Sequence, residues 1–244
     1  EKKIKIIVAT SGDTGSAVAS GFYGMPNIRV YILYPRKKVS LLQEKQLTTF
    51  GGNITAIEVK GNFDDCQRLA KQILLDKELK EKANLSSANS INFGRLLPQM
   101  FYYFWGYARL IGSNAVYCVP SGNFGNLTAG LMAKKMGLDV SRFIAATNIN
   151  DIVPRYLKTG KFVSRVSRET ISNAMDVGSP SNFARMLDMH GNDFRKMKKD
   201  IIGISVSDKE TCETIKNVYR ETNYICDPHT AVGVAAARKS NVSQ

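Results

Sequence analysis

Long hydrophobic runs are missing from this sequence of 244 residues. No apolar stretch approaches the roughly 18 residues that a membrane-spanning helix requires. The apolar run near the start, at residues 4–9, is too short and too strand-like for a signal peptide. Hydrophobic residues make up 43% of the chain and charged residues 23%, as in an ordinary globular protein. We therefore expect a protein with no membrane partner.

Cysteine and histidine are also scarce. The four cysteines, at positions 66, 118, 212 and 226, include no CxxC pair. The two histidines, His190 and His229, are too few for a histidine-based metal site. The sequence therefore predicts no metal centre, and the isolated thiols suit a reducing, cytoplasmic compartment.

Acidic residues are fewer than basic ones, 21 against 34, which gives a net charge of +13. Such a charge can attract nucleic acid, or it can draw a small anionic substrate toward its site. The basic clusters at residues 36–38 and 195–199 are short and lack interleaved aromatic residues. We interpret them as solvated faces without a nucleic-acid partner, and a non-catalytic nucleic-acid-binding module is the alternative.

The sequence does contain an alternation of strand and helix signals. In its first part, strands are predicted at residues 4–9, 30–34 and 54–59, and helices at 17–22, 41–50 and 64–74. A capping box that begins at Ser40 marks one helix start. This strand–helix–strand order predicts an α/β fold with parallel sheets and right-handed crossovers.

The rest of the chain continues the pattern. Strands are predicted at 115–119, 142–147 and 202–206, and helices at 96–110, 127–136, 152–157, 208–221 and after Pro228. Residues 84–95 are polar and are predicted as a loop. The helix at 96–110 carries six aromatic residues between positions 101 and 107, which we interpret as core and not as a base-stacking surface.

Two glycine-containing loops join a strand to a helix. One covers residues 121–126, with the sequence SGNFGN. Its glycines allow a sharp turn and a close approach to a ligand, and the next helix begins with free N–H groups. Such a loop is a seat for a phosphate, although the same residues also make an ordinary tight turn with nothing bound.

The other loop, at residues 10–16, places hydroxyl groups beside Gly12 and Asp13. With the helix N-terminal amides these groups can hold a carboxylate or a phosphate, and the alternative is a plain N-cap with Asp13 on its own helix dipole. The polar stretch before the aromatic helix contains Ser90, Asn92 and Arg95, which suit an oxyanion or cap the helix. Two strand–loop–helix units in one chain favour a ligand site.

Seven short motifs occur in order along the chain: TSGDTG at 10–15, YILYP at 31–35, LQEK at 42–45, NSIN at 89–92, PSGNFGN at 120–126, TNIND at 147–151 and SNAMDV at 172–177. Together they resemble the threonine synthases of the bacterial and fungal type. The resemblance covers essentially the whole chain, and the ordered set is far more specific than any one motif.

The resemblance implies a tryptophan synthase β-like fold, the fold type II of enzymes that use pyridoxal phosphate (PLP). This fold has two parallel-sheet α/β lobes with the cofactor between them. In this chain the resemblance implies a small mobile lobe at residues 1–88 and a partial large PLP-binding lobe at residues 89–244. The implied reaction converts O-phosphohomoserine and water into L-threonine and phosphate.

Residue roles carry over from the family by position. The residues that resemble the PLP phosphate loop are Ser121, Gly122, Asn123, Phe124, Gly125 and Asn126, and Asp13 resembles a residue beside the cofactor ring. The residues that the resemblance implies on the substrate side are Ser11, Gly12, Thr14, Ser90, Asn92 and Arg95. Residues 148–151 and 173–176 match family signature turns, to which we assign no chemical role.

One part of the family pattern is missing. The lysine that forms a Schiff base with PLP belongs to an upstream Phe-Lys-Asp-like segment, and no such segment occurs in this sequence. The segment that contacts the pyridine nitrogen, near the family's C-terminus, is missing as well. We therefore expect an internal fragment, incomplete at both ends and inactive by itself. The sequence leaves monomer and homodimer open.

An alternative within the same fold is a serine/threonine dehydratase. The resemblance implies an asparagine in dehydratases at the position where this chain has Asp13. The stretch at residues 89–92 also has no evident role in a dehydratase. Both points favour a threonine synthase.

Overall fold

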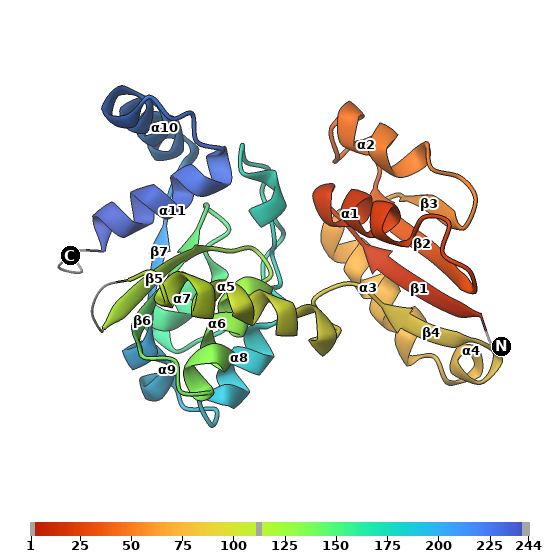
Figure 1. Ribbon diagram of the computed structural model, residues 1–244, viewed down its shortest axis with the longest axis horizontal. Coiled ribbons are helices and arrows are strands. Elements are labelled where there is room, and N and C mark those ends of the chain that lie inside the picture. The colour runs from red at the N-terminus through yellow and green to blue at the C-terminus, as the bar shows by residue number, and fades with distance from the viewer. Residues whose placement is uncertain (1–2, 111–113, 241–244) are drawn as a thin grey trace. The chain divides into compact units, whose positions relative to one another are not determined.

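The computed structural model describes residues 3–110 and 114–240. The chain divides into two units, residues 1–92 and residues 93–244 (Figure 1). The boundary expected from the sequence lies after residue 88. Among the described residues, no helix is long and apolar enough to cross a membrane.

The first unit contains a parallel sheet with helices on both faces. Its strands are β1 (Ile4–Ala9), β2 (Ile28–Pro35), β3 (Ile54–Val59) and β4 (Asn84–Ser87). Its helices are α1 (Asp13–Phe22), α2 (Leu41–Thr48), α3 (Phe63–Leu75) and α4 (Lys77–Lys82). The strand order is β3-β2-β1-β4, and each neighbouring pair is parallel. This arrangement confirms the predicted α/β fold.

Alternate residues of β1 supply two separate cores. Ile6 and Val8 lie in a cluster that includes residues of α1 and α2, while Ile7 and Ala9 lie in a cluster with α3. A parallel strand that is buried on both faces has a nearly continuous apolar sequence. This explains the strand signal at residues 4–9.

Strand β4 differs from the predicted loop at residues 84–95. Its sequence, Asn-Leu-Ser-Ser, has no apolar alternation. The strand exists because it pairs with β1, with Ile4 opposite Asn84 and Ile7 opposite Ser87. A strand defined by its partner leaves little signal in its own residues.

The second unit is organised around a three-stranded sheet. Its strands, β5 (Ala115–Pro120), β6 (Val140–Thr147) and β7 (Ile201–Ser205), lie in that order and are parallel. Its helices are α5 (Leu97–Tyr107), α6 (Gly125–Lys135), α7 (Ile152–Thr159), α8 (Phe183–Met189), α9 (Phe194–Asp200), α10 (Asp208–Thr222) and α11 (Pro228–Lys239). Two short 3-10 turns are η1 (Phe93–Arg95) and η2 (Asn173–Met175).

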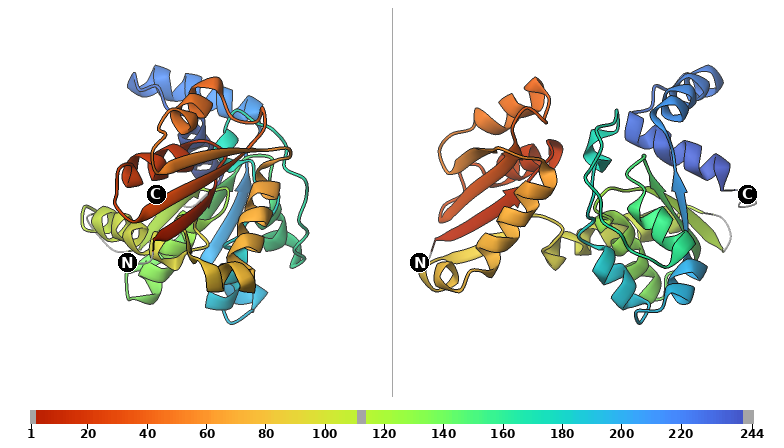
Figure 2. Two further views of the ribbon diagram at one scale, coloured as in Figure 1. Left: turned by 90° about the vertical axis from the view of Figure 1, so that its right-hand side faces the viewer. Right: turned by 180° about the vertical axis from the view of Figure 1, so that it is seen from behind.

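Helices cover both faces of this sheet as well. On β6, Phe143 and Ala145 lie in a cluster with residues of α5, α6, α7 and α9. Ile144 and Ala146, which alternate with them, lie in a cluster with α11. Figure 2 shows the blue helices α10 and α11 apart from the green and cyan helices on the other side of the sheet.

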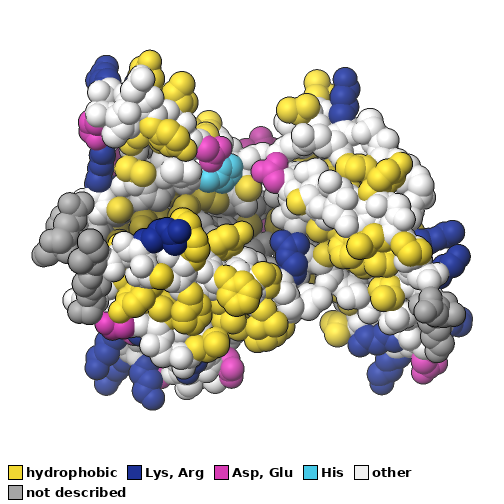
Figure 3. Space-filling model, in the orientation of Figure 1, with side chains coloured by type: hydrophobic (Ala, Val, Ile, Leu, Met, Phe, Trp, Pro, Cys, Tyr) yellow, Lys and Arg dark blue, Asp and Glu magenta, His cyan; other side chains and the backbone are white. Residues whose placement is uncertain are grey.

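Helix α5 differs from the prediction that its aromatic residues are core. Tyr103 is buried, but Phe101, Tyr102 and Trp105 are 66%, 74% and 62% exposed. An α-helix turns once every 3.6 residues, so a run of neighbouring aromatic residues must place some on the outer face. With Leu97, the three exposed rings form a hydrophobic patch over α5, seen as yellow side chains in Figure 3. We call it the α5 patch.

Candidate functional site

The loop that follows β5 is the predicted phosphate seat at residues 121–126. It starts at Ser121, whose N–H donates to Ala146 O at 2.9 Å and continues the pairing with β6. Phe124 has a left-handed backbone, with φ of 59°, and α6 begins at the next residue, Gly125. The loop therefore leads from the carboxyl end of a strand into the N-terminus of an 11-residue helix.

The N–H groups of this loop are available to a ligand. Within the described part of the chain, the backbone N–H groups of residues 122–126 donate to no protein acceptor. Leu127 N–H, the next along, donates to Asn126 Oδ1 at 2.9 Å. Unpaired amides at a helix N-terminus carry partial positive charge and suit the oxygens of a phosphate. The geometry of this loop therefore fits a phosphate group.

Ser121 and Asn126 give the loop its shape. Ser121 Oγ donates to Asn126 Oδ1 at 2.7 Å, and Asn126 Nδ2 donates to Pro120 O at 2.8 Å. The N–H and the hydroxyl of Ser121 are thus both engaged inside the protein. What the loop offers a ligand is its backbone, not these two side chains.

Asn123 is held from the side of α8. Its Oδ1 accepts a hydrogen bond from Ser181 N–H at 3.1 Å, and its backbone O accepts one from Asn182 Nδ2 at 3.0 Å. Helix α8 begins directly after Asn182. The start of α8 therefore braces the phosphate loop.

Gly122 lies against the turn η2. A Cβ added at Gly122 would lie 2.9 Å from Met175 Cα and 3.0 Å from Ala174 O. Contacts this short with backbone atoms leave no room for a side chain. Residue 122 must therefore be glycine because a second segment approaches it closely.

A partly buried polar cluster anchors the segment that carries η2. It consists of Asn148, Asn150, Thr170, Ser172 and Asp176, and we call it the Asn148–Asp176 cluster. Asp176 Oδ1 accepts hydrogen bonds from Asn148 Nδ2 at 2.8 Å and from Asn150 Nδ2 at 3.0 Å. Thr170 donates to the same carboxylate from Oγ1 at 2.7 Å and from its N–H at 2.9 Å. Burial raises the pKa of Asp176 to about 6, although the hydrogen bonds from Thr170 and Asn148 oppose the shift.

Both ends of this cluster belong to the motifs at residues 148–151 and 173–176, to which the sequence assigned no chemical role. Asn148 and Asn150 follow β6, whose carboxyl end lies beside that of β5, while Asp176 directly follows η2. The cluster thus ties η2 to the edge of the sheet where the phosphate loop begins. We conclude that these signature residues position η2 against Gly122.

His229 holds η2 as well. Its Nε2 accepts a hydrogen bond from Ala174 N–H at 3.1 Å, and its Nδ1 lies 2.8 Å from Asp227 Oδ1. A ring nitrogen that accepts carries no proton, so in this geometry the imidazole proton is on Nδ1. The start of α11 therefore contributes to the same support.

In the first unit, the predicted loop at residues 10–14 follows β1. The buried Thr10 accepts hydrogen bonds at Oγ1 from the N–H groups of Gly12, at 3.0 Å, and Gly15, at 2.8 Å. Gly12 has φ of 144°, and a Cβ added there would lie 2.4 Å from Gln43 Nε2. Thr10 and Gly12 therefore fix the shape of this loop.

Asp13, the first residue of α1, is paired within the unit. Gln43 Nε2 donates to Asp13 Oδ1 at 2.9 Å, and Gln43 Oε1 accepts from Ser40 N–H at 3.1 Å. The sequence identified Gln43 only as part of a capping box and missed this contact. Across the described residues, the hydroxyl groups of Ser11 and Thr14 have no hydrogen-bond partner, which leaves them free for a ligand.

A turn at residues 89–92 is tied to the same strand end. Asn89 pairs with both backbone groups of Ala9: its Oδ1 accepts from the N–H at 2.7 Å and its Nδ2 donates to the O at 2.6 Å. Asn92 Nδ2 donates to Ser87 O at 2.9 Å. The residues that gather at the carboxyl ends of β1 and β4 are Ser11, Gly12, Asp13, Thr14, Ser90 and Asn92. Arg95 belongs to η1 in the second unit.

The cysteines form no site of their own. All four are free thiols. Burial raises the pKa of Cys66 to about 12 and that of Cys118 to about 11, so neither is a thiolate nucleophile at neutral pH. No group of three or more His, Cys, Asp or Glu side chains that could hold a metal occurs among the residues described.

Sequence comparison relates the chain to threonine synthases. It is 48% identical to threonine synthase from Escherichia coli over 241 residues, which is 98% of this chain and 56% of that protein. It is 51% identical to threonine synthase from Buchnera aphidicola subsp. Schizaphis graminum, over 93% of this chain and 53% of that protein.

Solved structures extend the relation to the fold. The crystal structure of E. coli threonine synthase matches with a TM-score of 0.92 and 48% identity, covering 98% of this chain and 56% of that chain. The PLP-bound threonine synthase from Brucella melitensis matches with a TM-score of 0.84 and 35% identity. The match covers 99% of this chain and 58% of that chain. Threonine deaminase isoform 2 from Solanum lycopersicum shares the fold alone. It is 20% identical, with a TM-score of 0.71, and the match covers 96% of this chain and 60% of that chain.

The chain spans about half the length of the curated relatives it matches. The predicted fold, two parallel-sheet α/β lobes of the PLP fold type II, is confirmed by these structures. A family model described as pyridoxal-phosphate dependent enzyme matches residues 1–244. Because that match covers every residue, the chain belongs to the family of pyridoxal-phosphate dependent enzymes.

Proposed function

We propose that the protein to which this chain belongs is a threonine synthase, which uses PLP to convert O-phosphohomoserine and water into L-threonine and phosphate. Support comes from identities of 48% and 51% to threonine synthases over nearly the whole chain. The threonine deaminase, which stands for the dehydratase alternative, is only 20% identical.

The observation that carries the proposal is the run of unpaired N–H groups at residues 122–126. These backbone groups would hold the phosphate of PLP, while Ser121 and Asn126 keep the loop in shape. Bound PLP would supply an electron sink for carbanion chemistry. The role of this loop is to fix the cofactor at its phosphate end.

The first unit supplies groups suited to the substrate. We assign Ser11 and Thr14 to the substrate carboxylate, because their hydroxyl groups are free to donate. Gly12 contributes the turn, since its N–H already donates to Thr10. We assign Asp13 to the cofactor ring, with Gln43 orienting its carboxylate.

The phosphate of the substrate needs donors of its own. We assign Ser90, Asn92 and Arg95 to it, because amide, hydroxyl and guanidinium groups all donate to phosphate oxygens. In this proposal residues 89–244 are the PLP-binding lobe and residues 1–88 the smaller, mobile lobe.

We also propose that the Schiff-base lysine lies outside residues 1–244, so that this chain alone binds phosphate without turning over substrate. None of its lysines stands in a Phe-Lys-Asp-like segment. The full-length enzyme would be a monomer or a homodimer in the cytoplasm. That compartment suits the four free thiols.

The test is a product assay on the full-length protein, with O-phosphohomoserine as substrate and with PLP added or withheld. We expect threonine and phosphate in equal amounts, and only when PLP is present. Ammonia and a 2-oxo acid formed from threonine or serine would establish the dehydratase instead. Salt-dependent binding to DNA or RNA without phosphate release would establish the nucleic-acid-binding module.

A further inference from the structure

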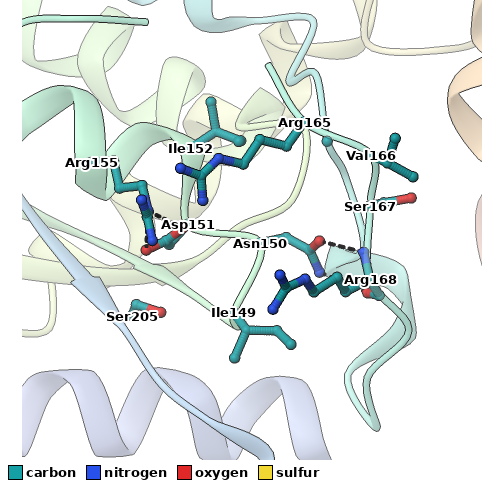
Figure 4. A pocket seen from close by; sticks show the side chains of 11 residues that line it. Ile149, Asn150, Asp151, Ile152, Arg155, Arg165, Val166, Ser167, Arg168 and Ser205 are labelled. Carbon is teal, nitrogen blue, oxygen red and sulfur yellow. Dashed lines mark hydrogen bonds and ion pairs between the residues drawn. The ribbon is translucent and has the colours of Figure 1, made fainter. Parts of the chain in front are cut away.

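A cavity of about 620 Å³ opens in the second unit, at the carboxyl ends of β6 and β7 (Figure 4). Its walls include Ile149, Asp151, Arg155, Gly178, Ser205 and the extended segment at residues 165–168. Small-molecule sites have volumes of about 300–1,000 Å³. The cavity is therefore large enough for a metabolite. None of its lining residues belongs to the loop at residues 121–126.

Three arginine side chains, those of Arg155, Arg165 and Arg168, extend toward the middle of this cavity (Figure 4). Arg155 is paired, with its Nε 2.8 and 2.9 Å from the two carboxylate oxygens of Asp151. In the described part of the chain, neither Arg165 nor Arg168 has an acidic partner. Three guanidinium groups face one carboxylate, which leaves the cavity wall with an excess of two positive charges.

Backbone contacts hold Arg165 and Arg168 at the cavity wall. Asn150 Oδ1 accepts from Arg168 N–H at 2.8 Å, and Asn150 Nδ2 donates to Arg168 O at 2.9 Å. Arg165 N–H donates to Gly178 O at 3.0 Å, and a Cβ added at Gly178 would lie 1.8 Å from Arg165 O. The two arginines therefore extend from a backbone that is fixed on both sides.

We propose that this cavity binds a small organic molecule that carries at least two negative charges. Guanidinium groups bind phosphate and carboxylate through paired hydrogen bonds. Ser167 adds a hydroxyl group, while Ile149 and Val166 provide apolar wall for the uncharged part of the ligand. The net charge of +13 favours the approach of any anion. This site does not depend on threonine synthase activity.

The test is a titration of the ¹⁵N-labelled 244-residue chain with pyrophosphate and, separately, with citrate, followed by amide NMR shifts. We expect saturable shifts at the amides of Ile152 and Ser167, which line the cavity. The double variant Arg165→Gln/Arg168→Gln should weaken this binding by about tenfold or more, because it removes two guanidinium groups that form charge-assisted hydrogen bonds. Tighter binding of pyrophosphate would identify a phosphate-bearing ligand, and tighter binding of citrate a polycarboxylate.

The matched control is Arg220→Gln, which removes an exposed arginine of α10 that does not line the cavity. It should leave the affinity unchanged. The double variant and the control should both fold, since the three arginine side chains are exposed. The proposal fails if shifts are confined to Gly122 and Gly125, which report the phosphate loop, or if the double variant and the control bind equally well.

Discussion

Asparagine side chains take the place of a neighbouring strand at two positions in this chain. Asn89 pairs with both backbone groups of Ala9, and Asn150 pairs with both backbone groups of Arg168. A side-chain amide has a donor side and an acceptor side, as a peptide group has. Single residues therefore extend the hydrogen bonding of the sheets into the loops that carry the candidate sites.

Gly122→Ala tests the phosphate loop at the residue scale. The new methyl group would meet Met175 Cα at 2.9 Å and Ala174 O at 3.0 Å, so the loop must shift. We expect the full-length variant to bind PLP at least about tenfold more weakly, since misplaced amides lose charge-assisted hydrogen bonds. The measurement is PLP binding followed by absorbance.

The matched control for Gly122→Ala is Gly21→Ala. Its added methyl group meets nothing within 4 Å, and Gly21 lies in α1. The control should bind PLP normally and gain a few tenths of a kcal/mol or more in stability, up to about 1 kcal/mol. Equal PLP affinity in the two variants would contradict the role of Gly122.

At the scale of elements, the Asn148–Asp176 cluster joins the end of β6 to η2. In this cluster the carboxyl group of Asp176 accepts every hydrogen bond that it makes. The donors are the side-chain amides of Asn148 and Asn150 and the N–H and hydroxyl groups of Thr170. Both carboxyl oxygens of Asp176 accept hydrogen bonds, whereas an asparagine at position 176 would replace one of these oxygens with an NH2 group that meets a donor.

Asp176→Asn should therefore lower the free energy of unfolding at neutral pH by about 1–3 kcal/mol, the cost of unsatisfied buried groups. Burial raises the pKa of Asp176 from 3.8 to about 6. Between these values the folded chain binds more protons than the unfolded chain, so the stability that Asp176 contributes falls as pH rises from about 4 to 6. The gap between wild type and variant should be wider at pH 4 than at pH 7.

Urea denaturation at both pH values measures this gap. Asp188→Asn, at an exposed position of α8, is the matched control and should show little change at either pH. A gap that grows as pH rises would mean that the Asp176 carboxylate is stabilised in the folded chain, contrary to the direction of its pKa.

Elements with local signals were predictable from the sequence. Strands β1 and β3 have the predicted bounds because each is an apolar or β-branched run between turn residues. The capping box of Ser40 with Gln43 forms as predicted. The loop at residues 121–126 was found because glycine between strand and helix signals is a local pattern.

Features that depend on distant partners were not predictable. Strand β4 exists because it pairs with β1. Ser87 Oγ, for example, donates to Ile7 O, which is 80 residues away in the sequence. The contact of Gln43 with Asp13 spans 30 residues, and that of Asn148 with Asp176 spans 28. A single sequence marks such residues as polar without indicating which side chain each will meet.

At the scale of the whole molecule, the α5 patch exposes Leu97, Phe101, Tyr102 and Trp105 on one helix. Contiguous exposed apolar surface of this kind favours association with another surface. The net charge of +13 opposes contact between two copies at low salt. Self-association of this chain should therefore strengthen as salt screens the charge.

Trp105 makes this prediction measurable, because it is the one tryptophan in the sequence. It is 62% exposed, and the Arg109 guanidinium lies 3.5 Å from its ring centroid. At low concentration and low salt we expect red-shifted emission and ready quenching by acrylamide. Raising concentration and salt should shift the emission to the blue as rings become buried.

Tyr102→Ser is the comparison, since it removes the most exposed ring of the α5 patch and leaves Trp105 in place. The blue shift should then need higher protein concentration. Blue-shifted emission at every dilution would mean that Trp105 is buried within a single chain.

The sequence separation of 28 residues from Asn148 to Asp176 also imposes an order on folding. A chain synthesised from its N-terminus completes β5 and β6 before Asp176 has emerged, and closing the intervening loop costs entropy. Until that closure occurs, the Asn148–Asp176 cluster does not hold η2 against Gly122. The ability to capture a phosphate is therefore acquired late, after the strands that frame the loop have already paired.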